Sequence, residues 1–126
     1  MADKSKKVLI IEDEKIVSDI YKTKLEKEGF FISQAFDGQT GLDMALQEKP
    51  DLIILDIILP KLNGVAVLDK LQMDSWGSTV PVLIATNMPE DPKLQRTAKG
   101  KLYEIVAKVD ISPNDLVKKV KEKIIR

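Results

Sequence analysis

The sequence predicts an α/β fold in which five parallel strands form a doubly wound sheet with helices on both faces. Two observations support this prediction. Short runs rich in Val, Ile and Leu, several of them almost continuously apolar, are typical of strands covered on both faces of a parallel sheet. Between these runs, apolar residues recur at helical spacing, and such an alternation is typical of successive βα units.

The strands and the first helix are the clearest elements of the pattern. The predicted strands are, in chain order, KVLIIED (7–13), FFISQAF (30–36), DLIILD (51–56), VPVLIAT (80–86) and YEIVAK (103–108). A helix is expected after the first strand, because Val17, Tyr21 and Leu25 recur every four residues. Gly29 is well placed to cap the end of this helix.

The remaining helices are predicted from shorter patterns. The second and third are indicated by residues at helical spacing: Leu42, Ala45 and Leu46, then Gly64, Val67, Leu68 and Leu71. Pro50 ends the second helix. The fourth helix, near 92–99, contains a single large apolar residue, Leu94. The last helix begins with Ser112 as N-cap and Pro113 at the first helical position.

The composition limits the class of protein. A chain of 126 residues suits a single domain, 1–126, in which residues 1–6 form a basic N-terminal tail. Lys and Arg number 20, as do Asp and Glu, so we expect no nucleic-acid partner and no membrane attraction. The apolar runs are too short to span a bilayer, and a soluble, cytoplasmic protein is expected.

Two absent residue types restrict the chemistry further. The chain has no Cys and no His. Thiolate nucleophiles, Ser-His catalysis and most transition-metal sites are therefore excluded. Carboxylates, hydroxyls, lysine and a hard, oxygen-binding cation remain as the groups that could carry a reaction.

Asp56 is the most unusual residue of the sequence, because it interrupts the apolar run LIILDIIL. An unpaired carboxylate buried among such neighbours costs several kcal/mol, so a partner or a purpose is expected. In open α/β sheets, ligands bind beyond the carboxyl ends of the strands. Asp56 stands at such an end, after the third predicted strand.

Polar residues end three of the other four predicted strands in the same way. Glu12 and Asp13 close the first run, Thr86 closes the fourth and Lys108 the fifth. Any one of them is well explained as a strand-end residue in contact with solvent, but the whole set at one rim is not. Crowded carboxylates resist ionisation together, and a divalent cation with oxygen ligands, Mg²⁺, resolves their repulsion.

Four segments carry a resemblance to a known family: VLIIEDE, LIILDIILPKLNG, VPVLIAT and VAK. In this order and spacing they resemble the motifs of response-regulator receiver domains, the phospho-accepting half of two-component signalling. The resemblance covers nearly the whole chain and is closest to single-domain, chemotaxis-like receivers. It implies a flavodoxin-like strand order of 2-1-3-4-5.

The resemblance also implies a role for each rim residue. Asp56 would be the phosphoacceptor, Lys108 would bind a phosphoryl oxygen, and the Thr86 hydroxyl would donate to the phosphoryl group. The implied Mg²⁺ ligands are Glu12, Asp13, Asp56 and the backbone carbonyl of Ile58. The donor would be a histidine kinase or a histidine phosphotransfer protein, and the output would act on a protein target that the sequence does not identify. Such a protein catalyses only its own phosphorylation and dephosphorylation and is not otherwise an enzyme.

Several positions depart from the family pattern. Val109 follows the lysine where the family usually has proline, and a cis peptide there would cost about 2.5–4 kcal/mol. Ile105 occupies the position of the aromatic that moves with the threonine in many receivers. Tyr103 faces the same side of the strand but lies about 7 Å further back. Ile58 and Met88 should flank the phosphoryl group, and as apolar residues they cannot orient water, which predicts slow self-dephosphorylation.

Two alternative functions are also compatible with an α/β fold of this kind. A pseudo-receiver would keep the fold and act as a phosphorylation-independent interaction module; Val109, Ile105 and the sparse fourth helix favour it, whereas the complete set of rim residues opposes it. A phosphohydrolase or nucleotide-binding enzyme is disfavoured, because the sequence has no GxxxxGK[ST] loop and no GxGxxG after the first strand. No second Asp stands two residues after Asp56 to act as acid or base.

Overall fold

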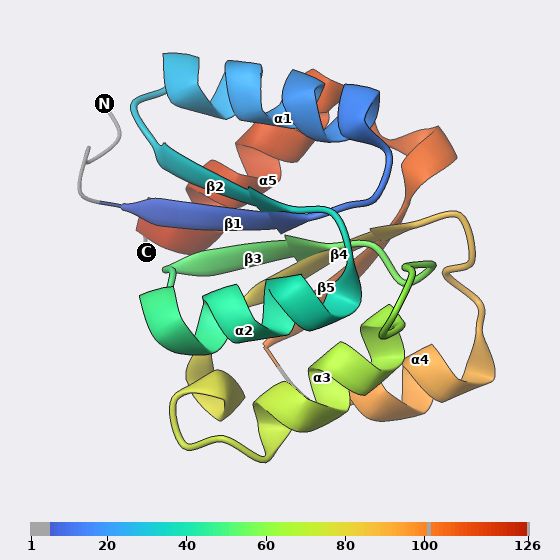
Figure 1. Ribbon diagram of the computed structural model, residues 1–126. Helices are drawn as coiled ribbons and strands as arrows, with labels where there is room; N and C mark the ends of the chain where they lie inside the picture. The colour runs from blue at the N-terminus through green and yellow to red at the C-terminus, as the bar shows by residue number, and fades with distance from the viewer. Residues whose placement is uncertain (1–5, 101, 126) are drawn as a thin grey trace.

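A computed structural model describes residues 6–100 and 102–125, which form one parallel sheet between two layers of helices (Figure 1). The strands are β1 (Lys7–Ile11), β2 (Phe31–Ala35), β3 (Leu52–Leu55), β4 (Val82–Thr86) and β5 (Tyr103–Ala107). The helices are α1 (Lys15–Lys27), α2 (Gly38–Glu48), α3 (Gly64–Gln72), α4 (Pro92–Ala98) and α5 (Pro113–Ile125), and two 3₁₀ turns are η1 (Gly77–Thr79) and η2 (Lys108–Asp110). The strand order β2-β1-β3-β4-β5 confirms the predicted topology. Of the predicted tail, 1–6, only Lys6 is among the described residues.

The core consists of two apolar clusters, one on each face of the sheet. In β1, Leu9 and Ile11 face the cluster shared with α2, α3 and α4. Val8 and Ile10 face the cluster shared with α1 and α5. Every residue of β3 and β4 is buried, which explains why these strands read as continuous apolar runs. Among the described residues, no helix is both long and apolar enough to cross a membrane.

The helix ends confirm two predicted caps and add three that were not predicted. Gly29 follows α1 with φ of 95°, the left-handed conformation that glycine adopts readily. At the start of α5, the backbone N–H of Asp115 donates to the Ser112 hydroxyl over 3.1 Å. The side chains of three further residues accept from backbone N–H groups at the starts of α2, α3 and α4: Asp37, Asn63 and Asp91. The fourth helix begins at Pro92 as predicted and ends at Ala98.

The N-terminal half of α2 lies unusually close to the rest of the molecule. A Cβ atom at Gly38 would overlap the carbonyl oxygen of Leu62, in the loop that follows β3. A Cβ atom at Gly41 would lie 2.7 Å from the side chain of Ile11 at the end of β1. The backbone N–H of Gly38 also donates to the carbonyl of Pro60 over 3.2 Å. Glycine at these two positions therefore lets α2 approach the loop backbone and the Ile11 side chain closely.

Candidate functional site

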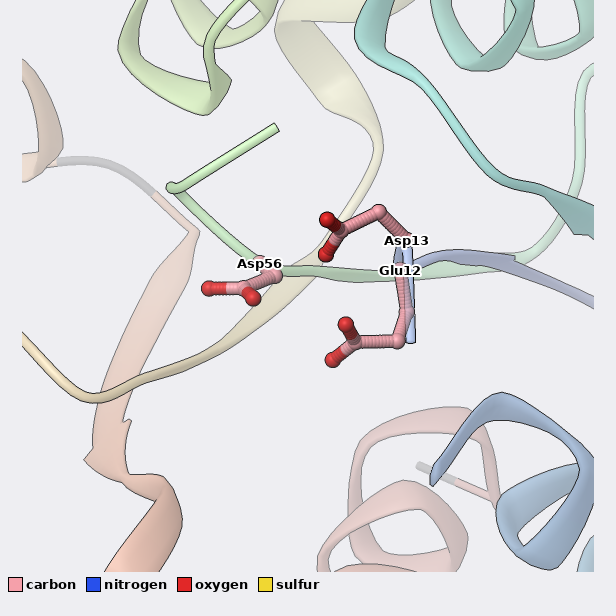
Figure 2. Close-up of side chains that lie close together, drawn as sticks. All are labelled: Glu12, Asp13 and Asp56. Carbon is pink, nitrogen blue, oxygen red and sulfur yellow. The ribbon is translucent and has the colours of Figure 1, made fainter. Parts of the chain in front are cut away.

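The predicted rim residues stand at the carboxyl ends of β1, β3, β4 and β5. Neighbouring strands pair in parallel and end at similar levels, so the residues that follow them lie at one edge of the sheet. Glu12, Asp13 and Asp56 each have a carboxylate oxygen within 4.8 Å of the others. Figure 2 shows these three carboxylates, with Glu12 and Asp13 on consecutive residues and Asp56 across from them. The structure thus brings together the three acids selected from the sequence.

Lys108 supplies the positive charge that the buried carboxylates need. Its ammonium nitrogen lies 2.5 Å from Oε1 of Glu12, 2.9 Å from Oδ2 of Asp56 and 3.4 Å from Oε1 of Glu14. The side chains of Glu12, Asp56 and Lys108 are only 3%, 8% and 10% exposed. The carboxylate that interrupts the apolar run is therefore neither unpaired nor in open solvent.

Burial and pairing act in opposite directions on these groups. Burial raises the pKa of Glu12 above its usual value, and the hydrogen bond from Lys108 offsets this only in part. Burial alone would lower the pKa of Lys108, but hydrogen bonds to Asp56 and Glu12 outweigh it and raise that pKa. Lys108 is accordingly a fixed positive charge across the neutral pH range. A cation beside Glu12 would favour its ionised form in the same way.

Backbone groups orient the remaining oxygens of the site. The N–H of Ile57 donates to Oδ1 of Asp56 over 2.6 Å, and the N–H of Glu14 donates to Oε2 of Glu12 over 3.0 Å. Thr86 is fully buried at the end of β4, and its hydroxyl oxygen accepts from the N–H of Met88 over 3.1 Å. The hydroxyl proton is not used in that bond, so Thr86 can still donate to a further group.

A small hollow opens beside the carboxylates of Asp13 and Asp56. Its volume is about 240 Å³, and it is lined by Asp13, Glu14, Asp56, Ile58 and Asn87. Carboxylate and carbonyl oxygens are the ligands that Mg²⁺ prefers, and Mg²⁺ commonly keeps several waters. The donor set and the open space beside it fit such an ion. The backbone carbonyl of Ile58 as a fourth ligand stays a prediction.

The departures at Ile105 and Val109 occur on and directly after β5. The described residues contain no cis peptide bond, so the peptide between Lys108 and Val109 is trans, and the Val109 side chain is 84% exposed. Ile105 and Tyr103 both pack against the cluster under α2, α3 and α4, which confirms that they share a face. Ile105 thus occupies an inward, partly buried position in place of an aromatic ring.

Comparison with known proteins identifies the family. Residues 8–121 match the sequence model of the response regulator receiver domain. The chain belongs to this family. Its relatives include the DNA-binding dual master transcriptional regulator RpaA of Synechocystis, 41% identical over 80 residues that make up 64% of this chain and 33% of RpaA. The response regulator ArlR of Staphylococcus aureus is 33% identical over 112 residues, 89% of this chain and 45% of ArlR. The receiver therefore spans less than half the length of these relatives.

Solved structures of other receivers have the same architecture. The receiver domain of the Francisella response regulator 1452 superposes with a TM-score of 0.85 at 26% identity, covering 97% of this chain and 98% of that one. The receiver domain of the sensor histidine kinase PA1611 of Pseudomonas aeruginosa has a TM-score of 0.82 at 20% identity, covering 96% and 98%, which shows the fold alone. That protein was solved with a magnesium ion coordinated in its active-site cleft. Receivers act in two-component signalling through kinases and downstream effectors.

One member of the site was not selected from the sequence. Glu14 contacts Lys108 and lines the hollow. In the sequence, however, it comes directly after the acidic pair and cannot be distinguished from an ordinary exposed residue. The sequence signal was the third acid in the segment EDE, which does not by itself specify where the side chain points. The expected absence of a nucleic-acid partner also stays a prediction, because relatives such as RpaA are named as DNA-binding regulators.

Proposed function

We propose that this receiver takes a phosphoryl group onto Asp56 from a histidine kinase or a histidine phosphotransfer protein, in a Mg²⁺-dependent step, and then signals to a partner protein. The observation that carries the proposal is the pairing of buried Asp56 with Lys108 at 2.9 Å, beside two further carboxylates. A nucleophilic carboxylate, a fixed ammonium and a set of oxygen ligands are the parts that phosphoryl transfer requires.

In the proposed step, a carboxylate oxygen of Asp56 attacks phosphorus while the bond from phosphorus to the donor nitrogen breaks. The product is an aspartyl phosphate, and the donor leaves as a free imidazole. Lys108 transfers its hydrogen bond from Asp56 to a phosphoryl oxygen and balances the negative charge there. Glu12, Asp13, Asp56 and the carbonyl of Ile58 would hold Mg²⁺, which supplies positive charge to the phosphoryl oxygens.

Thr86 is proposed to detect the phosphoryl group after transfer. Its hydroxyl accepts a hydrogen bond from Met88 and keeps its own proton available. A hydrogen bond donated by this hydroxyl to a phosphoryl oxygen would draw the end of β4 toward Asp56. The loop from β4 to α4 follows directly, so this is the part of the surface that we expect to change.

Incubation with acetyl phosphate tests the proposal, with and without Mg²⁺ and with intact mass as the readout. We expect the wild-type chain to gain the mass of one phosphoryl group only with Mg²⁺, and Asp56→Asn to gain none. Asp43→Asn is the matched control, because it makes the same change at an exposed position on α2. The proposal fails if the wild type gains no mass with Mg²⁺ or if Asp56→Asn gains it equally.

A second candidate is a pseudo-receiver that binds its partner without phosphorylation. The inward position of Ile105 favours it, because an aliphatic side chain there lacks the ring that moves with the threonine in many receivers. Beryllofluoride, which imitates the phosphoryl group, separates the two candidates. Amide chemical shifts that change from Asp56 through α4 and β5 support the switch, whereas an unchanged spectrum together with an unchanged mass supports the pseudo-receiver.

A further inference from the structure

Among the residues that the structure describes, Glu14 is the one acid in contact with Lys108 that the proposed phosphoryl transfer does not use. Its Oε1 lies 3.4 Å from the ammonium nitrogen, and its side chain is 60% exposed at the mouth of the hollow. The three carboxylates that gather to within 4.8 Å of one another are those of Glu12, Asp13 and Asp56, without Glu14. Its charge is therefore close to the site while its oxygens are outside the proposed ligand set.

The backbone fixes Glu14 in this place. It is the N-cap residue of α1, its carbonyl accepts from the N–H of Ser18 over 3.0 Å, and its own N–H donates to Glu12. N-cap side chains commonly accept from the first turn of the helix, but the Glu14 side chain makes no such bond. Its carboxylate extends instead toward Lys108, from a backbone that is held at both the N–H and the carbonyl.

The position of this charge has opposite consequences for the two ligands of the site. Lys108 is shared among Glu12, Asp56 and Glu14, and an incoming phosphoryl oxygen must use the same ammonium. Glu14 partly neutralises that ammonium and adds negative charge where an anionic donor enters. The same charge attracts a divalent cation, since a cleft lined by one sign of charge concentrates counter-ions.

We propose that Glu14 is a specificity-determining residue that favours the entry of a divalent cation and opposes the entry of a small anionic phosphodonor. It touches neither the reacting oxygen nor phosphorus and acts through Lys108 and through its own charge. The inference rests on the proposed function of Asp56. It predicts that removal of the Glu14 charge weakens cation binding and speeds phosphorylation by an anionic donor.

The test is Glu14→Gln, which keeps the shape of the side chain and removes its charge. We expect the Mg²⁺ dissociation constant, from amide chemical shifts, to rise about two- to five-fold, as for the loss of an exposed ion pair. At saturating Mg²⁺, we expect the rate of mass gain from acetyl phosphate to rise by a similar factor. Both changes should shrink at about 1 M salt, where screening is strong. Glu14→Asp, which keeps the charge, should retain wild-type Mg²⁺ affinity.

The control is Glu26→Gln, which makes the same change of net charge at an exposed position near the other end of α1. Structural damage at the site would weaken Mg²⁺ binding and slow phosphorylation together. The inference is overturned if both properties decline, or if either one changes no more than in the control. Failure of the proposed function is a separate result, because wild-type protein would then gain no mass at all.

Discussion

The centre of the sheet and its β5 edge differ in how tightly they are packed. Every residue of β3 and β4 is buried, whereas all five residues of β5 are only partly buried. Of the seven residues of α4, which lies beside this edge, only Leu94 and Ala98 are buried. Segments with few buried apolar contacts open at lower free energy than the core. The proposed acceptor Asp56 thus follows a tightly packed strand, whereas the elements that we expect to respond lie at the less tightly packed edge.

The largest effect is expected for Lys108→Met, at the site beside the tightly packed strands. This substitution leaves the buried carboxylates of Glu12 and Asp56 without their partner. We expect the free energy of unfolding to fall by roughly 3–5 kcal/mol, as for other broken buried ion pairs. Urea unfolding with and without Mg²⁺ measures this, and the cation should restore part of the loss by supplying a new partner charge. Lys61→Met is the control, since Lys61 is 71% exposed and lies 3.9 Å from Asp37. A loss that equals the control and ignores Mg²⁺ would contradict the role assigned to Lys108.

A pair of cavity-forming substitutions compares the two regions directly. Leu55 in β3 and Leu94 in α4 are both 0% exposed. We expect Leu55→Ala to cost about 4 kcal/mol and Leu94→Ala about 2 kcal/mol, because the short α4 can relax into its cavity. Hydrogen exchange should show faster exchange throughout the protein in the first variant and mainly in α4 and β5 in the second. Equal costs with equally widespread exchange would remove the proposed difference in rigidity.

Ile58→Asn tests the lifetime of the phosphorylated state. Ile58 and Met88 are 56% and 49% exposed beside the site, and neither can orient an attacking water. An amide at position 58 can do so, and we expect the aspartyl phosphate to decay about ten-fold faster with little change in stability. The loss of phosphoryl mass after donor removal measures the decay. Met73→Asn, at a position 86% exposed near the end of α3, should keep the slow rate; an unchanged lifetime in Ile58→Asn would refute the explanation.

The smallest expected effect concerns the ion pairs between β5 and α5. Glu104 lies 2.5 Å from Lys119 and 2.9 Å from Lys123, and the hydrogen bond from Lys119 lowers its pKa below the usual 4.5. A carboxyl with a lowered pKa stabilises the fold above its unfolded pKa, and this contribution disappears as pH falls through the folded pKa. Glu104→Gln should therefore be less stable near about pH 7 by no more than about 1 kcal/mol. Unfolding measured down to about pH 3 should show the difference vanish, whereas a difference that persists in acid would assign it to packing.

The fold and the rim of the site could be predicted because they depend on repeating patterns. Continuous apolar runs specify strands buried on both faces, and parallel strands place their ends at one edge. That argument selected Asp56 and Lys108, which are 52 residues apart in the chain and hydrogen-bonded in the structure. The same reasoning placed Ile105 and Tyr103 on one face, because strand residues alternate.

The features that escaped prediction depend on side-chain conformation and loop geometry. The contact of Glu14 with Lys108 requires a particular rotamer of each side chain, and no periodicity encodes it. The 3₁₀ turn that begins at Lys108 and the capping by Asp37 depend on local hydrogen bonds of one or two residues. The bond from Met88 to Thr86 is of the same kind. Such local contacts refine a fold that the spacing of apolar residues already specifies.

The two glycines of α2 restrict where the loop after β3 can move. At Gly38 and Gly41, α2 has no side chain of its own between its backbone and Leu62 or Ile11. The loop that carries the residues after Asp56 thus packs directly against α2, which leaves it little space to move in that direction. We therefore expect a displacement that follows phosphorylation of Asp56 to travel away from α2, toward β4 and β5.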